Sequence, residues 1–251
     1  RVKYFAATIL VFNPLKRFMG IDKVHSGFVG GASISPEVVR FFRVIGVPLY
    51  QVYGMTESSG LAFFQNADKT RVGAAGVLIR HPSVFLGYLD NEKATNETVI
   101  DGWLHTGDVI EQLDNGEIAI VDRKKSIIIT SGGKNITPSE IENALKDSIY
   151  ISEAIVVGEG RNFLGALLQI DYDTVGKWAQ AQGLAYTTFS HLSRMEPVRE
   201  LISKEVQRVN DAFARVENIR KFVLLKKELD HDDGEMTATQ KVRRNIIETK
   251  F

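Results

Sequence analysis

The 251 residues contain 31 basic and 31 acidic side chains, so no overall charge favours a nucleic acid or an anionic membrane surface as a partner. Cysteine is absent, which excludes disulfides, thiolate zinc sites and a cysteine nucleophile. No apolar run approaches the ~20 residues that span a bilayer, and nothing resembles a signal peptide.

The N-terminal third predicts helices that alternate with short strands. We first expect an amphipathic helix running towards Met19. Its apolar run 5–12, followed by Asn13-Pro14, is interpreted as the end of a packed helix. A strand and glycine turn over 24–32, a helix over 36–45 that is ended by Gly46, and a strand over 49–53 that leads into Gly54-Met55-Thr56-Glu57 are then expected in chain order. This alternation is typical of an α/β domain, in which ligands gather at the ends of the strands.

The middle of the chain predicts a hairpin. The sequence DGWLHTGD ends at Asp108 and leads into an alternating strand over 109–113, a turn over 114–116 and a second strand over 117–121. Arg123 follows the second strand of this hairpin and begins a basic turn that also contains Lys124 and Lys125.

The stretch from Asp122 to Asn135, DRKKSIIITSGGKN, joins that basic turn to an apolar strand and a glycine turn. Glycines allow close approach by a ligand, while Lys134 supplies a positive charge and Asn135 a donor and an acceptor, so the turn suits an anion. The alternative is an ordinary hairpin with a solvated basic end. Thr137, Pro138 and Glu140 then predict a helix that opens with a capping box.

The C-terminal half predicts a second patterned region, which begins at the basic turn 123–126. We expect strands over 151–157 and 164–170, a helix near 173–182, a longer helix over 197–216 with one apolar face, a strand over 222–225 and an acidic loop over 230–234. The apolar face is core. The acidic loop has no spaced metal-ligand partners, which favours a solvated loop over a metal site.

Four motifs together resemble the adenylate-forming enzymes, which include acyl-CoA synthetases, luciferases and the adenylation domains of peptide synthetases. They are QVYGMTE at 51–57, DGWLHTGD at 101–108, DRKKSIIITSGGKNITPSEIE at 122–142, and the tail Thr-x-Thr-x-Lys-x-x-Arg at 237–244. The form SGGKN, followed by P-x-x-I-E, is most similar to the long-chain fatty acyl-CoA synthetases.

The resemblance implies an α/β large-domain remnant, residues 1–124, which is the C-terminal part of the AMP-binding domain, followed by a small, mobile α+β C-terminal domain, residues 125–251. The match falters from Thr70, where Gly76 runs into Val77 and about a hairpin of the family pattern is missing. The Ser/Thr/Gly-rich loop with which the family holds the ATP phosphates is not found. We therefore expect a C-terminal portion that does not turn over alone.

The resemblance also assigns roles to individual residues. The nucleotide site is expected to comprise Gly30, Gly31, Ala32, Tyr53, which faces the adenine ring, Gly54, Thr56, which binds a phosphate, Asp108, which accepts the ribose hydroxyls, and Arg123, together with Gly133, Lys134 and Asn135 of the glycine turn. Glu57 is the expected Mg²⁺ ligand, Lys125 the hinge, and Lys241 the catalytic lysine, with Thr56 and Glu57 beside it in the catalytic set. Taken singly, each could be a turn residue, a core edge or a solvated charge.

The implied reaction is a fatty acid–CoA ligation: ATP activates a carboxylic acid to an acyl-adenylate, and coenzyme A then takes the acyl group. ATP, Mg²⁺ and coenzyme A are the expected cofactors, and the expected location is cytoplasmic. A peripheral membrane contact and a homodimer are left open. The alternatives are an acyl-AMP ligase that acts on a carrier protein, and an inactive fragment that serves as an interaction module.

Overall fold

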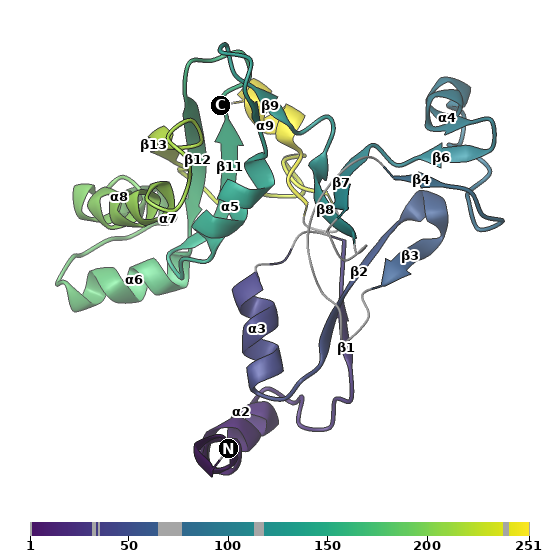
Figure 1. The fold of residues 1–251 in the computed structure, drawn as a ribbon. Helices are drawn as coiled ribbons and strands as arrows, with labels where there is room; N and C mark the ends of the chain where they lie inside the picture. The colour runs from purple at the N-terminus through teal and green to yellow at the C-terminus, as the bar shows by residue number, and fades with distance from the viewer. Residues whose placement is uncertain are drawn as a thin grey trace. The chain divides into compact units, whose positions relative to one another are not determined.

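The computed structural model describes residues 2–31, 34, 36–64, 77–112, 118–237 and 241–250. Contacts divide the chain into two compact units, Arg1–Lys125 and Ser126–Phe251 (Figure 1). Ala32, the faltering segment 70–76 and the predicted turn 114–116 lie outside the described residues. Within the described ranges, no helix is long and apolar enough to cross a membrane.

The N-terminal helical segment runs to Phe18, which confirms the predicted helix towards Met19, whereas the prediction that a helix ends at Asn13-Pro14 is wrong. The α-helix α1 (Val2–Ala7) passes into a π-helical turn η1 (Thr8–Phe12) and then into α2 (Asn13–Phe18). Proline lacks the N–H that would continue an α-helical ladder, and the wider π turn just before it accommodates the missing bond. Nor is the segment packed, because Phe5 and Leu10 are 67% and 74% exposed.

A three-stranded sheet forms the centre of the first unit. Strand β1 (Gly27–Val29) runs parallel to β2 (Leu49–Met55), and β3 (Gly60–Phe64) pairs antiparallel with β2 on its other side. Helix α3 (Pro36–Val44) lies between β1 and β2 in the chain. As predicted, a turn at Gly46 terminates it, and the φ of 84° at Gly46 is easily reached only without a Cβ.

The rest of the first unit consists of short paired strands. A second sheet has the order β4-β6-β5 and is followed by the antiparallel pair β7-β8. The bounds are β4 Leu78–Ile79, α4 Glu92–Thr98, β5 Val99–Ile100, β6 Trp103–His105, β7 Asp108–Gln112 and β8 Ile118–Arg123. Pairing of β7 with β8 confirms the predicted hairpin and sets Asp108 opposite Arg123.

The second unit is a sheet covered by helices. Its strand order is β11-β12-β13, in which β12 is antiparallel to β11 and parallel to β13. The bounds are β9 Ile128–Ile129, β10 Asn135–Ile136, α5 Pro138–Lys146, β11 Ile151–Val157, β12 Leu164–Ile170, α6 Tyr172–Ala181, α7 Phe189–Leu192, α8 Glu196–Asn210, β13 Ile219–Leu224 and α9 Arg244–Lys250. The predicted bounds of β11 and β12 are confirmed to the residue.

Helix α8 stops six residues before the predicted end at Val216. The Asn210 side chain accepts from Ile219 N at 2.8 Å and donates to Ile219 O at 3.0 Å, so it ties the helix end to the start of β13. Val216 is 52% exposed and lies outside the helix. A polar side chain that bonds to the backbone of a neighbouring strand ends a helix that the apolar spacing alone would continue.

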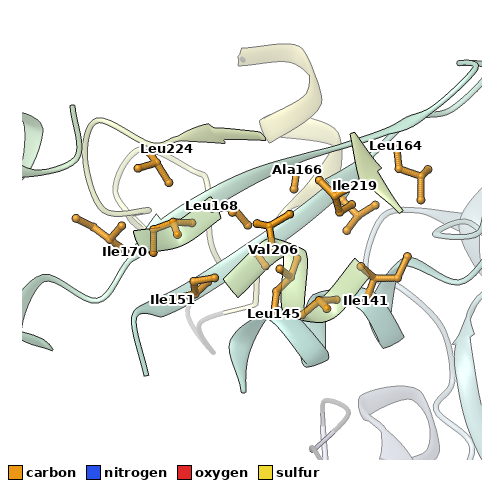
Figure 2. Close-up of a cluster of buried hydrophobic side chains, with 14 of the residues drawn as sticks. Ile141, Leu145, Ile151, Leu164, Ala166, Leu168, Ile170, Val206, Ile219 and Leu224 are labelled. Atoms are coloured by element: carbon orange, nitrogen blue, oxygen red, sulfur yellow. The ribbon is translucent and has the colours of Figure 1, made fainter. Parts of the chain in front are cut away.

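The core of the second unit is one large cluster of side chains from strands β9 to β13 and helices α5 to α8. Figure 2 labels members on α5, β11, β12, α8 and β13. Its members include Ile141 and Leu145 of α5, Ile151, Leu164, Ala166, Leu168 and Ile170 of the sheet, and Val206 of α8. The α8 stripe is core, as predicted. A smaller cluster, Ile155, Leu225, Leu229 and Ile247, packs α9 against the sheet.

Two local details of this unit differ from expectation or refine it. Thr137 takes the cap position of α5 but makes no side-chain capping hydrogen bond, so the capping box expected with Glu140 does not form through that hydroxyl. In the acidic loop His231 and Asp232 are exposed, as expected for a solvated loop. Asp233, however, pairs with Lys227.

Candidate active site

The glycine turn after β1 lies against the strand that carries Tyr53. A Cβ on Gly30 would lie 2.5 Å from the carbonyl oxygen of Val52, so only glycine lets the turn approach β2 this closely. Gly31 follows with a φ of 87°. The structure therefore brings Gly30 and Gly31 next to the end of β2, where Tyr53 and Gly54 stand.

Asp108 is the centre of a three-residue cluster in the first unit. Its Oδ2 accepts from the Tyr53 hydroxyl at 2.5 Å, and its Oδ1 pairs with Arg123 Nε at 2.9 Å. The Asp108 side chain is 6% exposed, whereas that of Arg123 is 62% exposed. The predicted nucleotide residues Tyr53, Asp108 and Arg123 thus come together, although 55 residues separate the first two in the chain.

The backbone around Asp108 is held by Thr106, a residue to which the sequence assigned no role. The buried Thr106 hydroxyl donates to Val77 O at 3.0 Å and accepts from Asp108 N at 3.2 Å. Across the hairpin, Lys124 N donates to Gly107 O at 2.8 Å. These bonds fix the turn, so the carboxylate of Asp108 is oriented before a ligand arrives.

Burial, together with donation of its hydroxyl to Asp108, raises the pKa of Tyr53. The phenol is therefore neutral near pH 7 and is a hydrogen-bond donor to the carboxylate. Because each carboxylate oxygen has two lone pairs, Asp108 can accept from Tyr53 and Arg123 and still accept from a ligand hydroxyl.

Glu57, the predicted metal ligand, is in a short 3-10 turn, η2 (Thr56–Ser58), directly after β2. Its Oε1 accepts from the Tyr88 hydroxyl at 2.6 Å, and its carbonyl accepts from Phe85 N at 2.8 Å. Burial and this hydrogen bond raise the pKa of Tyr88. Thr56 is exposed beside Glu57. The contact of Tyr88 with Glu57 could not be predicted from the sequence, because no local pattern links residues that are 31 positions apart.

The glycine turn of the second unit is a tight hairpin between β9 and β10. Thr130 N donates to Lys134 O at 3.0 Å, Gly133 N donates to Thr130 O at 2.8 Å, and Gly133 has a φ of 71°. The hairpin also contacts the β11–β12 loop, since Ser131 N donates to Arg161 O and Gly160 N to Ile129 O. Lys134 and Asn135 are exposed, and among the described residues no carboxylate pairs with Lys134. In conformation, this turn is therefore the ordinary hairpin with a solvated basic end that the sequence left open as an alternative to an anion site.

Lys241 stands on a second hairpin of the same unit. Met236 and Val242 form an antiparallel bridge, Thr237 N donates to Lys241 O at 2.8 Å, and Lys241 N donates to the Thr237 hydroxyl at 3.0 Å. The side chain is exposed and, among the described residues, has no carboxylate partner. The motif residues 238–240 lie outside the described part of the chain.

Lys125, the predicted hinge, is exposed and is the last residue of the first unit. The boundary between the units thus falls one residue after the predicted end of the first domain. Movement about Lys125 stays a prediction.

Comparison with known proteins gives two family matches. A model of the C-terminal domain of AMP-binding enzymes matches residues 125–251, which is half of the chain, and a model of AMP-binding enzymes matches residues 8–98. The long-chain-fatty-acid–CoA ligase FadD15 of Mycobacterium bovis is 33% identical over 267 residues, a match that covers 100% of this chain and 44% of that protein.

Solved structures show the same fold. The A domain of a carboxylic acid reductase from Segniliparus rugosus, in complex with AMP and a co-purified carboxylic acid, has a TM-score of 0.74 at 18% identity, covering 100% of this chain and 44% of that one. O-succinylbenzoate coenzyme A synthetase from Bacillus subtilis, in complex with ATP and a magnesium ion, has a TM-score of 0.64 at 21% identity, covering 89% and 46%. The chain spans less than half the length of these proteins and belongs to the AMP-binding enzymes, the adenylate-forming superfamily, with similarity to its fatty acid–CoA ligases.

Proposed function

We propose that this chain supplies part of the nucleotide site and the mobile C-terminal domain of a fatty acid–CoA ligase. The observation that carries the proposal is the buried, pre-oriented Asp108 carboxylate at the start of β7, with Tyr53 of β2 and Arg123 of β8 as its partners. The fatty acid as substrate rests on the similarity to long-chain-fatty-acid–CoA ligases.

In the first half-reaction, an oxygen of the fatty acid carboxylate bonds to the α-phosphorus of ATP, and the bond to pyrophosphate breaks. Asp108 accepts hydrogen bonds from the ribose hydroxyls, and the ring of Tyr53 stacks on adenine. The exposed guanidinium of Arg123 faces the sugar or the α-phosphate. Gly30 and Gly31 permit the backbone to lie close to the nucleotide. Because both reactants are anions, positive charge that neutralises them lowers the barrier.

Glu57 and Thr56 fit a magnesium ion that is bound jointly with the nucleotide. Mg²⁺ is often held by one or two carboxylates, with substrate phosphates and waters as its other ligands. Glu57 presents one carboxylate, whose Oε1 is oriented by Tyr88, and Thr56 is an exposed hydroxyl for a phosphate. When bound, the ion would neutralise phosphate charge.

Lys241 is the lysine of the adenylation step. An ammonium beside the attacking carboxylate and the α-phosphate stabilises the charge that gathers in the transition state. Its exposure on a hairpin, without a carboxylate partner among the described residues, leaves that charge available.

In the second half-reaction, the thiol sulfur of coenzyme A attacks the acyl carbon, the thiol proton is lost, and AMP leaves. Gly133, Lys134 and Asn135 provide a glycine turn, a cation and an amide on a hairpin that is tied to its neighbouring loop. A turn with these groups suits an anionic, phosphate-bearing ligand such as coenzyme A or the adenylate. Rotation about Lys125 would exchange the two domain orientations.

The test is ATP–pyrophosphate exchange by the complete protein with a panel of fatty acids, followed by thioester formation with coenzyme A. We expect exchange that depends on the fatty acid and falls on the order of 10²–10³-fold in Lys241→Ala, the loss typical of one transition-state charge partner. Exchange without fatty acid specificity, or equal exchange by Lys241→Ala, would contradict the proposal. Transfer of the acyl group to a carrier protein instead of coenzyme A would contradict the ligase proposal and favour the alternative, an acyl-AMP ligase.

A further inference from the structure

Two carboxylates lie at the base of the hairpin that carries Lys241, one beside each leg: Glu235, which is buried, and Glu142, which is partly buried. The described legs of this hairpin are residues 235–237 and 241–243. Its legs are joined by the Met236–Val242 bridge and by Arg243 N, which donates to Glu235 O at 2.8 Å. Sequence analysis assigned no role to either carboxylate.

Glu235 holds the first leg. Its side chain is fully buried, yet Oε1 accepts from Lys250 Nζ at 2.5 Å and Oε2 accepts from Lys227 Nζ at 2.7 Å and from Asp230 N at 3.1 Å. Lys227 follows β13 and Lys250 ends α9, so one carboxylate joins the hairpin to the sheet and to the last helix. Burial alone would raise the pKa of Glu235, but the hydrogen bonds from the two lysines lower it overall.

Glu142 holds the second leg through Arg244, the residue that follows the hairpin. Arg244 Nη1 donates to Val156 O at 2.5 Å and Nη2 donates to Glu142 Oε1, which also accepts from Val156 N at 2.7 Å. The two side chains are 23% and 12% exposed. The leg is therefore fixed to α5, which carries Glu142, and to β11, which carries Val156.

The apolar sides of the legs reinforce this attachment. Met236 and Val242 pack on the small cluster of Ile155, Leu225, Leu229 and Ile247, which is separate from the large core. Because that cluster has few members, the hairpin belongs to a region that can open locally while the large core stays folded. Its position consequently depends on the two charged attachments.

Burial raises the pKa of Glu142, although Arg244 lowers it in part. A partly buried ion pair of this kind contributes little net stability, because the desolvation of the charges offsets their attraction. Its better-attested contribution is to specify the position of the groups that it joins. Lys241 has a flexible stem, and catalysis by a charge depends on its placement to about 1 Å.

We propose that Glu235 and Glu142 are positioning residues, which hold the two legs of the hairpin so that the ammonium of Lys241 is presented at one fixed place during adenylation. The inference rests on the proposed function, because it assigns Lys241 to the adenylation step. Neither carboxylate contacts substrate. Both act on the reaction through the hairpin backbone.

The experiment measures both half-reactions of the complete protein in Glu235→Gln and Glu142→Gln. We expect kcat for adenylation to fall by on the order of 10- to 100-fold, as for a displaced catalytic group, with KM for ATP unchanged. The thioester step from supplied acyl-adenylate is expected to be unchanged, since Lys241 has no role in it. Equal loss in both half-reactions, or a loss expressed only in KM, would overturn the proposal.

Matched controls separate position from general damage. Asp233→Asn removes an exposed carboxylate that shares Lys227 and Lys250 with Glu235. Glu153→Gln removes the Lys146–Glu153 pair, which joins α5 to β11 without touching the hairpin. Both should change the adenylation rate by no more than about twofold, as exposed or peripheral substitutions do. A control that loses as much as Glu235→Gln would contradict the proposal.

Combination with Lys241→Ala gives a readout that a structural role would not produce. Once the lysine is gone, its position is irrelevant, so Glu235→Gln should add no further loss of adenylation rate. A further loss in the double variant would show that Glu235 acts elsewhere. If Glu235→Gln does not fold, Lys250→Met, which removes one exposed partner, should give a smaller loss of the same kind, and no loss there would overturn the proposal.

Hydrogen exchange distinguishes failure of this inference from failure of the proposed function. The Thr237 and Arg243 amides, which close the hairpin, should lose protection in both variants, while the β11–β12 amides keep it. Unchanged protection would overturn the inference even if Lys241→Ala abolishes adenylation. If Lys241→Ala leaves adenylation intact, the assigned role of Lys241 fails instead, and with it the catalytic part of the inference.

Discussion

The two units hold their candidate functional side chains in opposite ways. In the first unit these side chains pair with one another: Asp108 bonds to Tyr53 and Arg123, and Glu57 bonds to Tyr88. In the second unit, among the described residues, the ammonium groups of Lys134 and Lys241 have no carboxylate partner, while the carboxylates of Glu235 and Glu142 bond to other cations.

The two units also differ in the size of the apolar core that supports their candidate site residues. Within the described residues, the large core of the second unit has members on five strands and on four helices. The buried apolar side chains of the first unit are Val39, Ile45, Val47, Val77 and Leu104. A site of mutually paired side chains is oriented without a large core beneath it, but a ligand must share its hydrogen bonds. Hairpin lysines remain available to a ligand and need a rigid support.

Asp108→Ala should produce the largest effect in the first unit, because it removes the centre of the paired cluster. Hydrogen bonds to a charged group contribute ~1.5–3 kcal/mol, which corresponds to a roughly 10- to 150-fold rise in KM for ATP. The measurement is initial-rate kinetics of ATP–pyrophosphate exchange in the complete protein. An unchanged KM would mean that Asp108 is structural and that the paired cluster is not the ribose site.

Lys125→Pro tests whether the two units exchange orientations. Proline fixes φ near −65°, so a hinge at this residue could no longer rotate. We expect adenylation to be spared and thioester formation to fall on the order of tenfold, because the second orientation becomes inaccessible. Paired half-reaction rates provide the check, with Lys124→Ala as a control that leaves φ free. Equal loss of both half-reactions would place the hinge elsewhere.

Tyr53→Phe tests the pairing within the first unit, because it keeps the aromatic ring and removes only the hydroxyl that orients Asp108. A neutral hydrogen bond contributes about 0.5–1.5 kcal/mol, so KM for ATP should rise by no more than roughly tenfold. The effect should be smaller than that of Asp108→Ala. A lower KM would instead show that the Tyr53 hydroxyl competes with the nucleotide for Asp108.

The smallest effect expected is a pH dependence of stability that distinguishes Glu235 from Glu142 in the second unit. The folded pKa of Glu235 is lowered from 4.5, so its contribution to stability is complete above that value and is lost as the pH falls through the folded pKa. The folded pKa of Glu142 is raised, so the wild type gains stability at this site as the pH falls. Urea unfolding from pH 7 to pH 3 should thus narrow the stability advantage of the wild type over Glu235→Gln and widen it over Glu142→Gln. The same trend for both variants would contradict these assignments.

Local patterns in the sequence were sufficient to predict much of the backbone. The apolar stretches over 151–157 and 164–170 predict the bounds of β11 and β12, the β7–β8 hairpin follows from its alternating strands, and Gly46 marks the end of the helix before it. Each of these features depends on residue type within a short window, where steric and hydrogen-bonding preferences decide the conformation. The resemblance to a family, in contrast, predicted Tyr53, Asp108 and Arg123 as parts of one nucleotide site, and the structure brings these three residues into contact.

Tertiary structure alone decided the partners that hold the site residues. Glu57 meets Tyr88 across 31 residues, Arg244 meets Glu142 across 102, and Glu235 joins two lysines from β13's end and α9. Tertiary bonds also ended α8 at Asn210, against its apolar spacing. A charged residue has the same local signature whether it is solvated or buried, because its burial is set by the packing of elements that are distant in the chain.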